Sequence, residues 1–249
     1  MECGIVLAEF GEREKQIREF VKNVRKVSGL PIVIFSDRPY TNLGEGVLVR
    51  VLPVESCHWQ GHRRYFNRNN DFWKVQGVLQ TADDFDVVLV LDDDMRIVHK
   101  DFMEGFELAE KFGLCLPMNP RVYFGIDREV GDDVSPDVMI DTKDCPYGMT
   151  ANNMGVIFLN NLNNRAMSVL ERYLSYMENH PCRGPVAMAV SCWRERFGPY
   201  FLPEEWCACG GYTQFKQRSG KRINPMFLHV GHPDVNQWFQ TEPVFSDFR

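Results

Sequence analysis

Residues 87–94 read VVLVLDDD, a run of five apolar side chains followed by three aspartates. A continuous apolar run of this length is typical of a strand that is buried on both faces of a sheet. The aspartates cannot follow it into the core, because burying a charge without a partner is strongly unfavourable. The stretch therefore predicts a central strand that ends at residue 91 and places Asp92, Asp93 and Asp94 at the edge of the sheet.

Similar segments on both sides of this strand suggest the rest of the architecture. Further apolar runs that read as strands lie at residues 4–9, 31–35, 47–52, 113–117 and 151–160. Apolar residues recur at helical spacing in residues 17–27, 102–109 and 166–177. The alternation of strand and helix predicts an α/β fold with a mainly parallel central sheet, helices on both faces and ligand sites at the carboxyl ends of the strands.

Length and composition narrow the class of protein. With 249 residues, 44% of them hydrophobic, the chain is expected to form a single domain over residues 1–249. The net charge of -6 argues against a nucleic-acid partner, since phosphate backbones are held by clustered Lys and Arg. No apolar run approaches the roughly 20 residues that span a bilayer, and the first residues lack the basic segment of a signal peptide. We therefore expect a cytoplasmic protein without a membrane span.

Asp92 and Asp94 have the spacing of a divalent-cation site. In an extended backbone, side chains two residues apart project to the same side, so these carboxylates can share one ion, whereas Asp93 points elsewhere. A solvated acidic turn or the N-cap of a helix explains the same residues. The cluster alone therefore leaves a metal site and a plain acidic turn as open interpretations.

Three motifs, in order along the chain, resemble those of a known enzyme family. Residues 91–98, LDDDMRIV, follow an apolar run and resemble the DxD motif of GT-A glycosyltransferases. Residues 153–156, NMGV, resemble the N-x-G-V strand of the family 8, glycogenin-like transferases, and residues 229–231, HVG, resemble their C-terminal H-x-G. The resemblance implies a metal-dependent glycosyltransferase with a GT-A (Rossmann-like) fold.

The resemblance also implies roles for individual residues. Asp92, Asp94 and His229 would bind a Mn²⁺ or Mg²⁺ ion that bridges the donor diphosphate, and such an ion accepts carboxylate and imidazole ligands. Taken alone, His229 is an ordinary partly buried histidine and Asp37 a turn-forming residue. The implied nucleotide-sugar site, with UDP as the favoured nucleotide, is lined by Ala8, Glu9, Asp37, Lys74, Asp92, Asp93, Asn153 and Gly155.

The acceptor side is less well defined. We expect residues 1–118 to form the nucleotide-binding half and residues 119–249 to form the half that binds a glycan or other hydroxyl acceptor. Asn153 and Glu205 are the candidate catalytic residues, with Asn153 facing the donor sugar and Glu205 as a possible base, although Glu205 also reads as an exposed loop carboxylate. Residues 232–238 read HPDVNQW where the family commonly has K-P-W, and the family's D-Q pair has no counterpart near residues 183–186. The acceptor and the stereochemistry stay open.

Three other functions fit parts of the pattern. A sugar-nucleotidyltransferase would carry a glycine-rich phosphate loop after the first strand, where this chain reads AEFGEREKQ at residues 8–16. A phosphatase of the haloacid dehalogenase type also uses D-x-D, but its motif usually continues to Thr or Val where this chain has Arg96. A non-catalytic nucleotide-sugar-binding module would have a degenerate site, whereas Asp92, Asp94 and His229 are all present.

Overall fold

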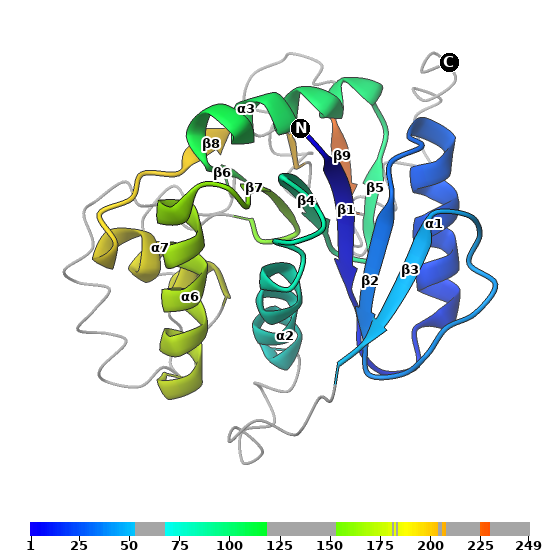
Figure 1. Ribbon diagram of the computed structural model, residues 1–249, viewed down its shortest axis with the longest axis horizontal. Coiled ribbons are helices and arrows are strands. Elements are labelled where there is room, and N and C mark those ends of the chain that lie inside the picture. The colour runs from blue at the N-terminus through cyan, green and yellow to red at the C-terminus, as the bar shows by residue number, and fades with distance from the viewer. Residues whose placement is uncertain are drawn as a thin grey trace, which may run out of the picture.

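A seven-stranded sheet forms the centre of the computed structural model (Figure 1). The structure describes residues 1–52, 68–118, 153–180, 182, 184–203, 206–207 and 225–229. The strands of the central sheet, in spatial order, are β3 (Val47–Val51), β2 (Ile32–Ser36), β1 (Cys3–Ala8), β4 (Val87–Leu91), β7 (Val156–Asn160), β6 (Leu114–Pro117) and β8 (Tyr200–Leu202). A second, small sheet pairs β5 (Met95–Ile97) with β9 (Phe227–His229).

Strand direction explains which segments meet at one edge of the sheet. Neighbouring strands run parallel except at β7, which is antiparallel to both β4 and β6. The mainly parallel sheet expected from the sequence is therefore confirmed. Of the apolar run at residues 151–160, the structure describes residues 153–160, and in that part the strand begins at Val156. Because β7 is reversed, residues 153–155 enter it at the edge where β1, β2 and β4 end.

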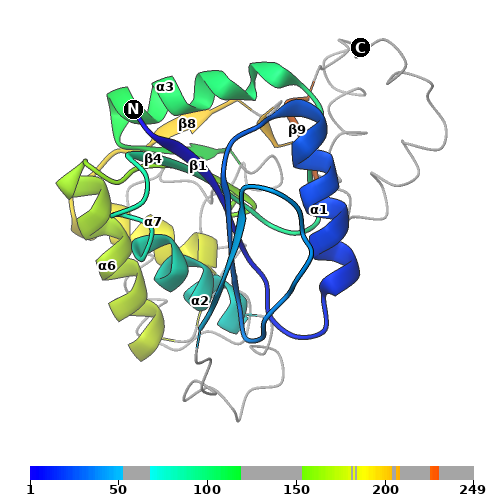
Figure 2. The ribbon, with the colours of Figure 1, turned by 45° about the vertical axis from the view of Figure 1, so that its right-hand side comes forward.

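Helices cover both faces of the sheet, as expected. One face carries α1 (Glu14–Val27) and α3 (Glu104–Phe112), which follows the short 3-10 helix η2 (Lys100–Met103). The other face carries α2 (Arg68–Leu79), α6 (Asn164–Asn179) and α7 (Gly184–Arg194). In Figure 2, β1 runs between α1 and α2. Within the described ranges, no helix is long and apolar enough to cross a membrane.

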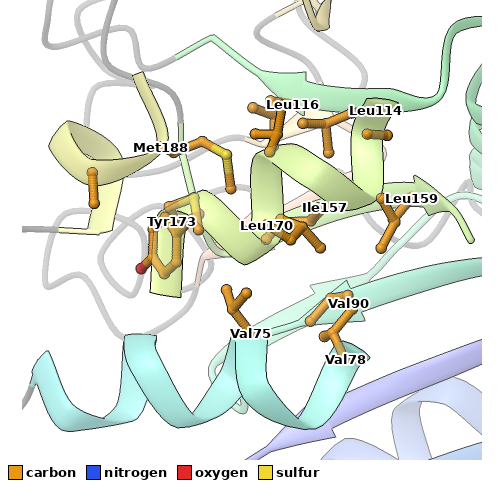
Figure 3. Close-up of a cluster of buried hydrophobic side chains, with 14 of the residues drawn as sticks. Val75, Val78, Val90, Leu114, Leu116, Ile157, Leu159, Leu170, Tyr173 and Met188 are labelled. Atoms are coloured by element: carbon orange, nitrogen blue, oxygen red, sulfur yellow. The ribbon is translucent and has the colours of Figure 1, made fainter. Parts of the chain in front are cut away.

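The side chains of β4 divide between two hydrophobic cores. Val88 and Val90 belong to the core on the α2 side, and Leu89 and Leu91 belong to the core on the α1 side, because successive residues of a strand point to opposite faces. Figure 3 shows Val78 of α2 beside Val90. Full burial of one such side chain contributes about 1.5–3 kcal/mol. The strand that leads to the acidic cluster is therefore firmly held on both faces.

Candidate functional site

The acidic cluster forms a turn between β4 and β5. The amide of Asp92 donates to the carbonyl of Gly155 at 3.1 Å, and the amide of Met95 donates to the carbonyl of Asp92 at 3.1 Å. The guanidinium of Arg96 donates to the carbonyl of Asp93 at 2.7 Å. These bonds fix the backbone of the turn, while the carboxylates of Asp92, Asp93 and Asp94 stay partly exposed. The cluster is an acidic turn whose side chains can serve a ligand.

His229 reaches this turn through the second sheet. Strand β9 pairs with β5 so that His229 lies opposite Met95, and its Nε2 atom lies 2.9 Å from Oδ2 of Asp94. Burial lowers the pKa of His229, but the hydrogen bond to Asp94 and the charges of Asp94 and Asp92 outweigh burial, so the pKa is raised. The structure therefore brings together two of the three expected metal ligands.

Lys74 lies against the third expected ligand. Its side chain enters from α2 and is 3% exposed, with Nζ 2.6 Å from Oδ1 of Asp92. The ammonium also donates to the carbonyl of Met154 at 2.8 Å and lies 3.7 Å from Oδ1 of Asp71. Burial alone would lower the pKa of Lys74, but the charges of Asp92 and Asp71 raise it by more. The pKa is therefore raised, and the ammonium stays charged.

Asn153 and Gly155 line the same edge. The amide of Asn153 donates to the carbonyl of Pro117 at 3.0 Å, and its side-chain oxygen accepts from the amide of Gly155 at 2.8 Å. A Cβ atom on Gly155 would lie 3.0 Å from Oδ1 of Asn153, 3.2 Å from Oδ2 of Asp92 and 3.3 Å from the sulfur of Met95. A side chain at residue 155 would therefore crowd Asn153, Asp92 and Met95, whereas glycine leaves them room to converge.

Glu9 follows β1 and forms a second carboxyl pair with Asp93. Glu9 is 6% exposed, and its side chain is hydrogen-bonded to Asp93. Burial, with the charge of Asp93 adding to the effect, raises the pKa of Glu9 to about 8. Arg13 lies 3.6 Å from Glu9 and 3.9 Å from Asp93. Sequence reasoning missed Arg13, which belongs to no motif and lies immediately before α1.

Asp37 holds the loop that follows β1. Its Oδ1 accepts from the amide of Gly11 at 3.0 Å, and the hydroxyl of Tyr40 donates to the carbonyl of Gly11 at 2.8 Å. Gly11 has a φ of +86°, a conformation that favours glycine. The hydrogen bond from Arg38 lowers the pKa of Asp37. Asp37 thus fixes the loop at the sheet edge through the amide of Gly11, and Tyr40 fixes it through the carbonyl of Gly11. Sequence reasoning missed Tyr40.

The residues present suit a metal ion without forming a finished cage. Within the described ranges, no group of three or more His, Cys, Asp or Glu side chains is arranged to hold a metal. Asp94 and His229 nevertheless converge to 2.9 Å, and their oxygen and nitrogen donors fit Mn²⁺. One carboxylate oxygen of Asp92 accepts a hydrogen bond from Lys74. The candidate base Glu205 lies outside the described residues, as do residues 119–152 and 230–249.

Known structures share this architecture. The galactosyltransferase LgtC, solved in complex with donor and acceptor sugar analogues, matches with a TM-score of 0.62 and 13% identity over 98% of this chain and 94% of that chain. The chain has the GT-A fold. Mouse xyloside xylosyltransferase 1 matches this GT-A chain with a TM-score of 0.58 and 12% identity, over 92% of this chain and 97% of the mouse chain. The glycosyltransferase GlyE of Streptococcus pneumoniae matches with a TM-score of 0.55 and 14% identity, over 100% of this chain and 62% of that chain.

No protein-family model and no curated protein sequence matches the GT-A chain. At these identities the likeness establishes the fold alone.

Proposed function

We propose that the chain is a metal-dependent glycosyltransferase that moves a sugar from a nucleotide-diphosphate sugar to a glycan or other hydroxyl acceptor. The observation that carries the proposal is the contact between Asp94 and His229, 2.9 Å apart, at the carboxyl edge of a GT-A sheet. A carboxylate and an imidazole from distant parts of the chain converge where ligands of open α/β sheets bind.

Charge supports a role for a cation. The carboxyl groups of Glu9, Asp92, Asp93 and Asp94 gather at this edge, with Lys74 and Arg13 among the neighbouring cations. A diphosphate placed beside the carboxylates of Asp92 and Asp94 would be repelled unless a divalent ion intervened. Asp94, His229 and Asp92 would hold Mn²⁺ or Mg²⁺, which supplies Lewis-acid stabilisation of the departing diphosphate when bound.

The loop after β1 supports a nucleoside subsite. The amide of Gly11 donates to Asp37, and the carbonyl of Gly11 accepts from Tyr40. Ala8 and Glu9 lie at the end of β1 beside that loop. With its pKa near 8, Glu9 keeps a proton at neutral pH and donates it in the hydrogen bond to Asp93. UDP is the nucleotide we favour, on the resemblance to family 8.

Asn153 is the proposed contact for the donor sugar. Its oxygen accepts from Gly155, which leaves the Nδ2 group to donate to a sugar hydroxyl. Gly155 keeps this side chain close to Asp92. The acceptor is proposed to bind in the half formed by residues 119–249, with Glu205 as the candidate base.

Turnover assays test the proposal. Incubation with a panel of nucleotide-sugars, Mn²⁺ and simple glycosides should release nucleoside diphosphate, and Asp94→Ala should abolish the release. Inorganic phosphate released from simple phosphomonoesters would instead favour a phosphatase. Pyrophosphate-dependent exchange would favour a nucleotidyltransferase, and donor binding without turnover across all acceptors would favour a binding module.

A further inference from the structure

Strand β5 has one edge that faces a helix instead of a strand. Within the described ranges, β5 pairs with β9 alone, and in Figure 1 it lies between β9 and α1. In an antiparallel pair, opposite residues alternate between those that exchange both backbone hydrogen bonds and those that exchange none. The amide of Val98 donates to the carbonyl of Met226 at 3.0 Å. Met95 and Ile97 therefore direct their amides and carbonyls away from β9, toward the other edge.

Asn23 of α1 supplies the partners for Ile97 on that edge. Its Oδ1 accepts from the amide of Ile97 at 2.9 Å, and its Nδ2 group donates to the carbonyl of Ile97 at 3.1 Å. A side-chain amide carries the same donor and acceptor as a peptide group, so Asn23 pairs with Ile97 as a residue of a neighbouring strand would. Ile97 is buried, and its backbone groups would have little access to water without this partner.

The remaining groups on this edge have partners beside the acidic turn. The amide of Met95 donates to the carbonyl of Asp92 at 3.1 Å, and the guanidinium of Arg96 donates to the carbonyl of Met95 at 2.9 Å. Glu19, one turn before Asn23 on α1, lies 3.7 Å from Arg96, but its side chain is 53% exposed, and exposed ion pairs contribute little. Of these two polar links between α1 and β5, the one from Asn23 is the stronger.

The position of β5 matters for the site because β9 pairs with it. His229 lies opposite Met95 in that pairing, and its Nε2 atom lies 2.9 Å from Oδ2 of Asp94. We infer that Asn23 is a positioning residue for the metal site: it holds β5 against α1 and thereby sets where β9 presents His229 to Asp94. The inference rests on the proposed function, because it assigns Asn23 to the metal end of the donor site.

A double-mutant cycle tests whether Asn23 acts through His229. UDP with Mn²⁺ is titrated calorimetrically into the wild-type chain, Asn23→Ala, His229→Ala and the double variant. Asn23→Ala should weaken binding by about fivefold or more, because a ligand that is held less precisely binds the ion less well. In the His229→Ala background, the same substitution should change the dissociation constant by less than about twofold, since the imidazole that Asn23 positions is already absent.

Hydrogen exchange of the metal-free chain gives a second readout, which needs no binding. Asn23→Ala should speed up the exchange of backbone amides in both β5 and β9, because local opening of β5 then loses less. Exchange in β4 should keep its wild-type rate, since β4 is held by the central sheet. Faster exchange in β9 is the result that connects Asn23 to the strand of His229.

Two controls separate positioning from general stability. Asn179→Ala removes an exposed amide that donates to the carbonyl of Ser175 on its own helix at 2.7 Å, and this variant should bind like the wild type. Val169→Ala truncates a fully buried side chain of α6 and should lower the unfolding temperature without weakening the binding of UDP and Mn²⁺. If Asn23→Ala does not fold, Asn23→Asp, which keeps an acceptor for the amide of Ile97, takes its place.

The opposite results overturn the inference. Wild-type affinity in Asn23→Ala, a loss of the same size in the His229→Ala background, or an equal loss in Val169→Ala would each show that Asn23 does not position His229. Unchanged exchange of β9 in Asn23→Ala would show the same. A wild-type chain that binds no UDP with Mn²⁺ is a different result: it refutes the proposed function, whereas the exchange of β9 in the metal-free chain still decides whether Asn23 holds the strand of His229.

Discussion

Gly155 offers the sharpest test of the site geometry, because one methyl group would touch two of its residues at once. In Gly155→Ala, the new Cβ would lie 3.0 Å from Oδ1 of Asn153 and 3.2 Å from Oδ2 of Asp92. Each neighbour must then move by a few tenths of an ångström. Overpacking of this kind costs about 1–3 kcal/mol, and it would displace two groups that are proposed to face the ligand. We therefore expect a moderate loss of stability and about a tenfold or greater loss of affinity for UDP with Mn²⁺.

Calorimetric titration and urea unfolding of Gly155→Ala measure the two effects separately. Gly198→Ala is the matched control, because a Cβ on Gly198 meets nothing within 4 Å and its φ lies outside the positive range. The control should bind like the wild type and be equally or slightly more stable, since alanine restricts the unfolded chain. Wild-type affinity in Gly155→Ala would refute the placement of Asn153 and Asp92 around the ligand.

Two further predictions concern the end of β1. Glu9→Gln should stabilise the chain at pH 8. The buried carboxyl of Glu9 has a pKa raised from 4.5 to about 8, so in the folded chain it keeps a proton that the unfolded chain releases. Its contribution to stability is therefore full below pH 4.5 and is lost as the pH rises toward 8. The gain, on the order of a few kcal/mol, should appear in urea unfolding at pH 8 and shrink toward pH 5; a gain independent of pH would contradict it. Tyr40→Phe removes only the hydroxyl that holds Gly11 and should weaken UDP binding several-fold at unchanged Mn²⁺ affinity, both measured by calorimetry, whereas unchanged UDP affinity would remove this loop from the nucleoside subsite.

Local sequence patterns were sufficient for the sheet but not for the direction of every strand. The apolar run of β4 and the aspartates after it predicted a central strand with an acidic edge, and both are present. The apolar run at residues 151–160 does not indicate whether its strand runs parallel or antiparallel to its neighbours, because an apolar pattern carries no information on pairing partners. The antiparallel course of β7, which brings Asn153 to the site, became visible only in the structure.

Contacts between distant parts of the chain limited how many site residues and their contacts could be predicted from the sequence. Asp94 and His229 are 135 positions apart, so only the family motifs could link them. The sequence placed Lys74 near the donor but could not reveal that its ammonium is buried against Asp92 and Met154, because those contacts depend on how α2 packs. Arg13 and Tyr40 belong to no motif, and their partners Asp93 and Gly11 lie in loops that follow other strands.

The most direct test of the account is a calorimetric titration of UDP into the chain after chelation, and again after Mn²⁺ is restored. Binding should require the ion, and His229→Ala and Asp94→Asn should each weaken Mn²⁺-dependent binding by at least about tenfold while the chain stays folded by circular dichroism. UDP binding of equal strength with and without Mn²⁺, or unchanged by both substitutions, would contradict the claim that Asp94 and His229 form the metal-dependent donor site.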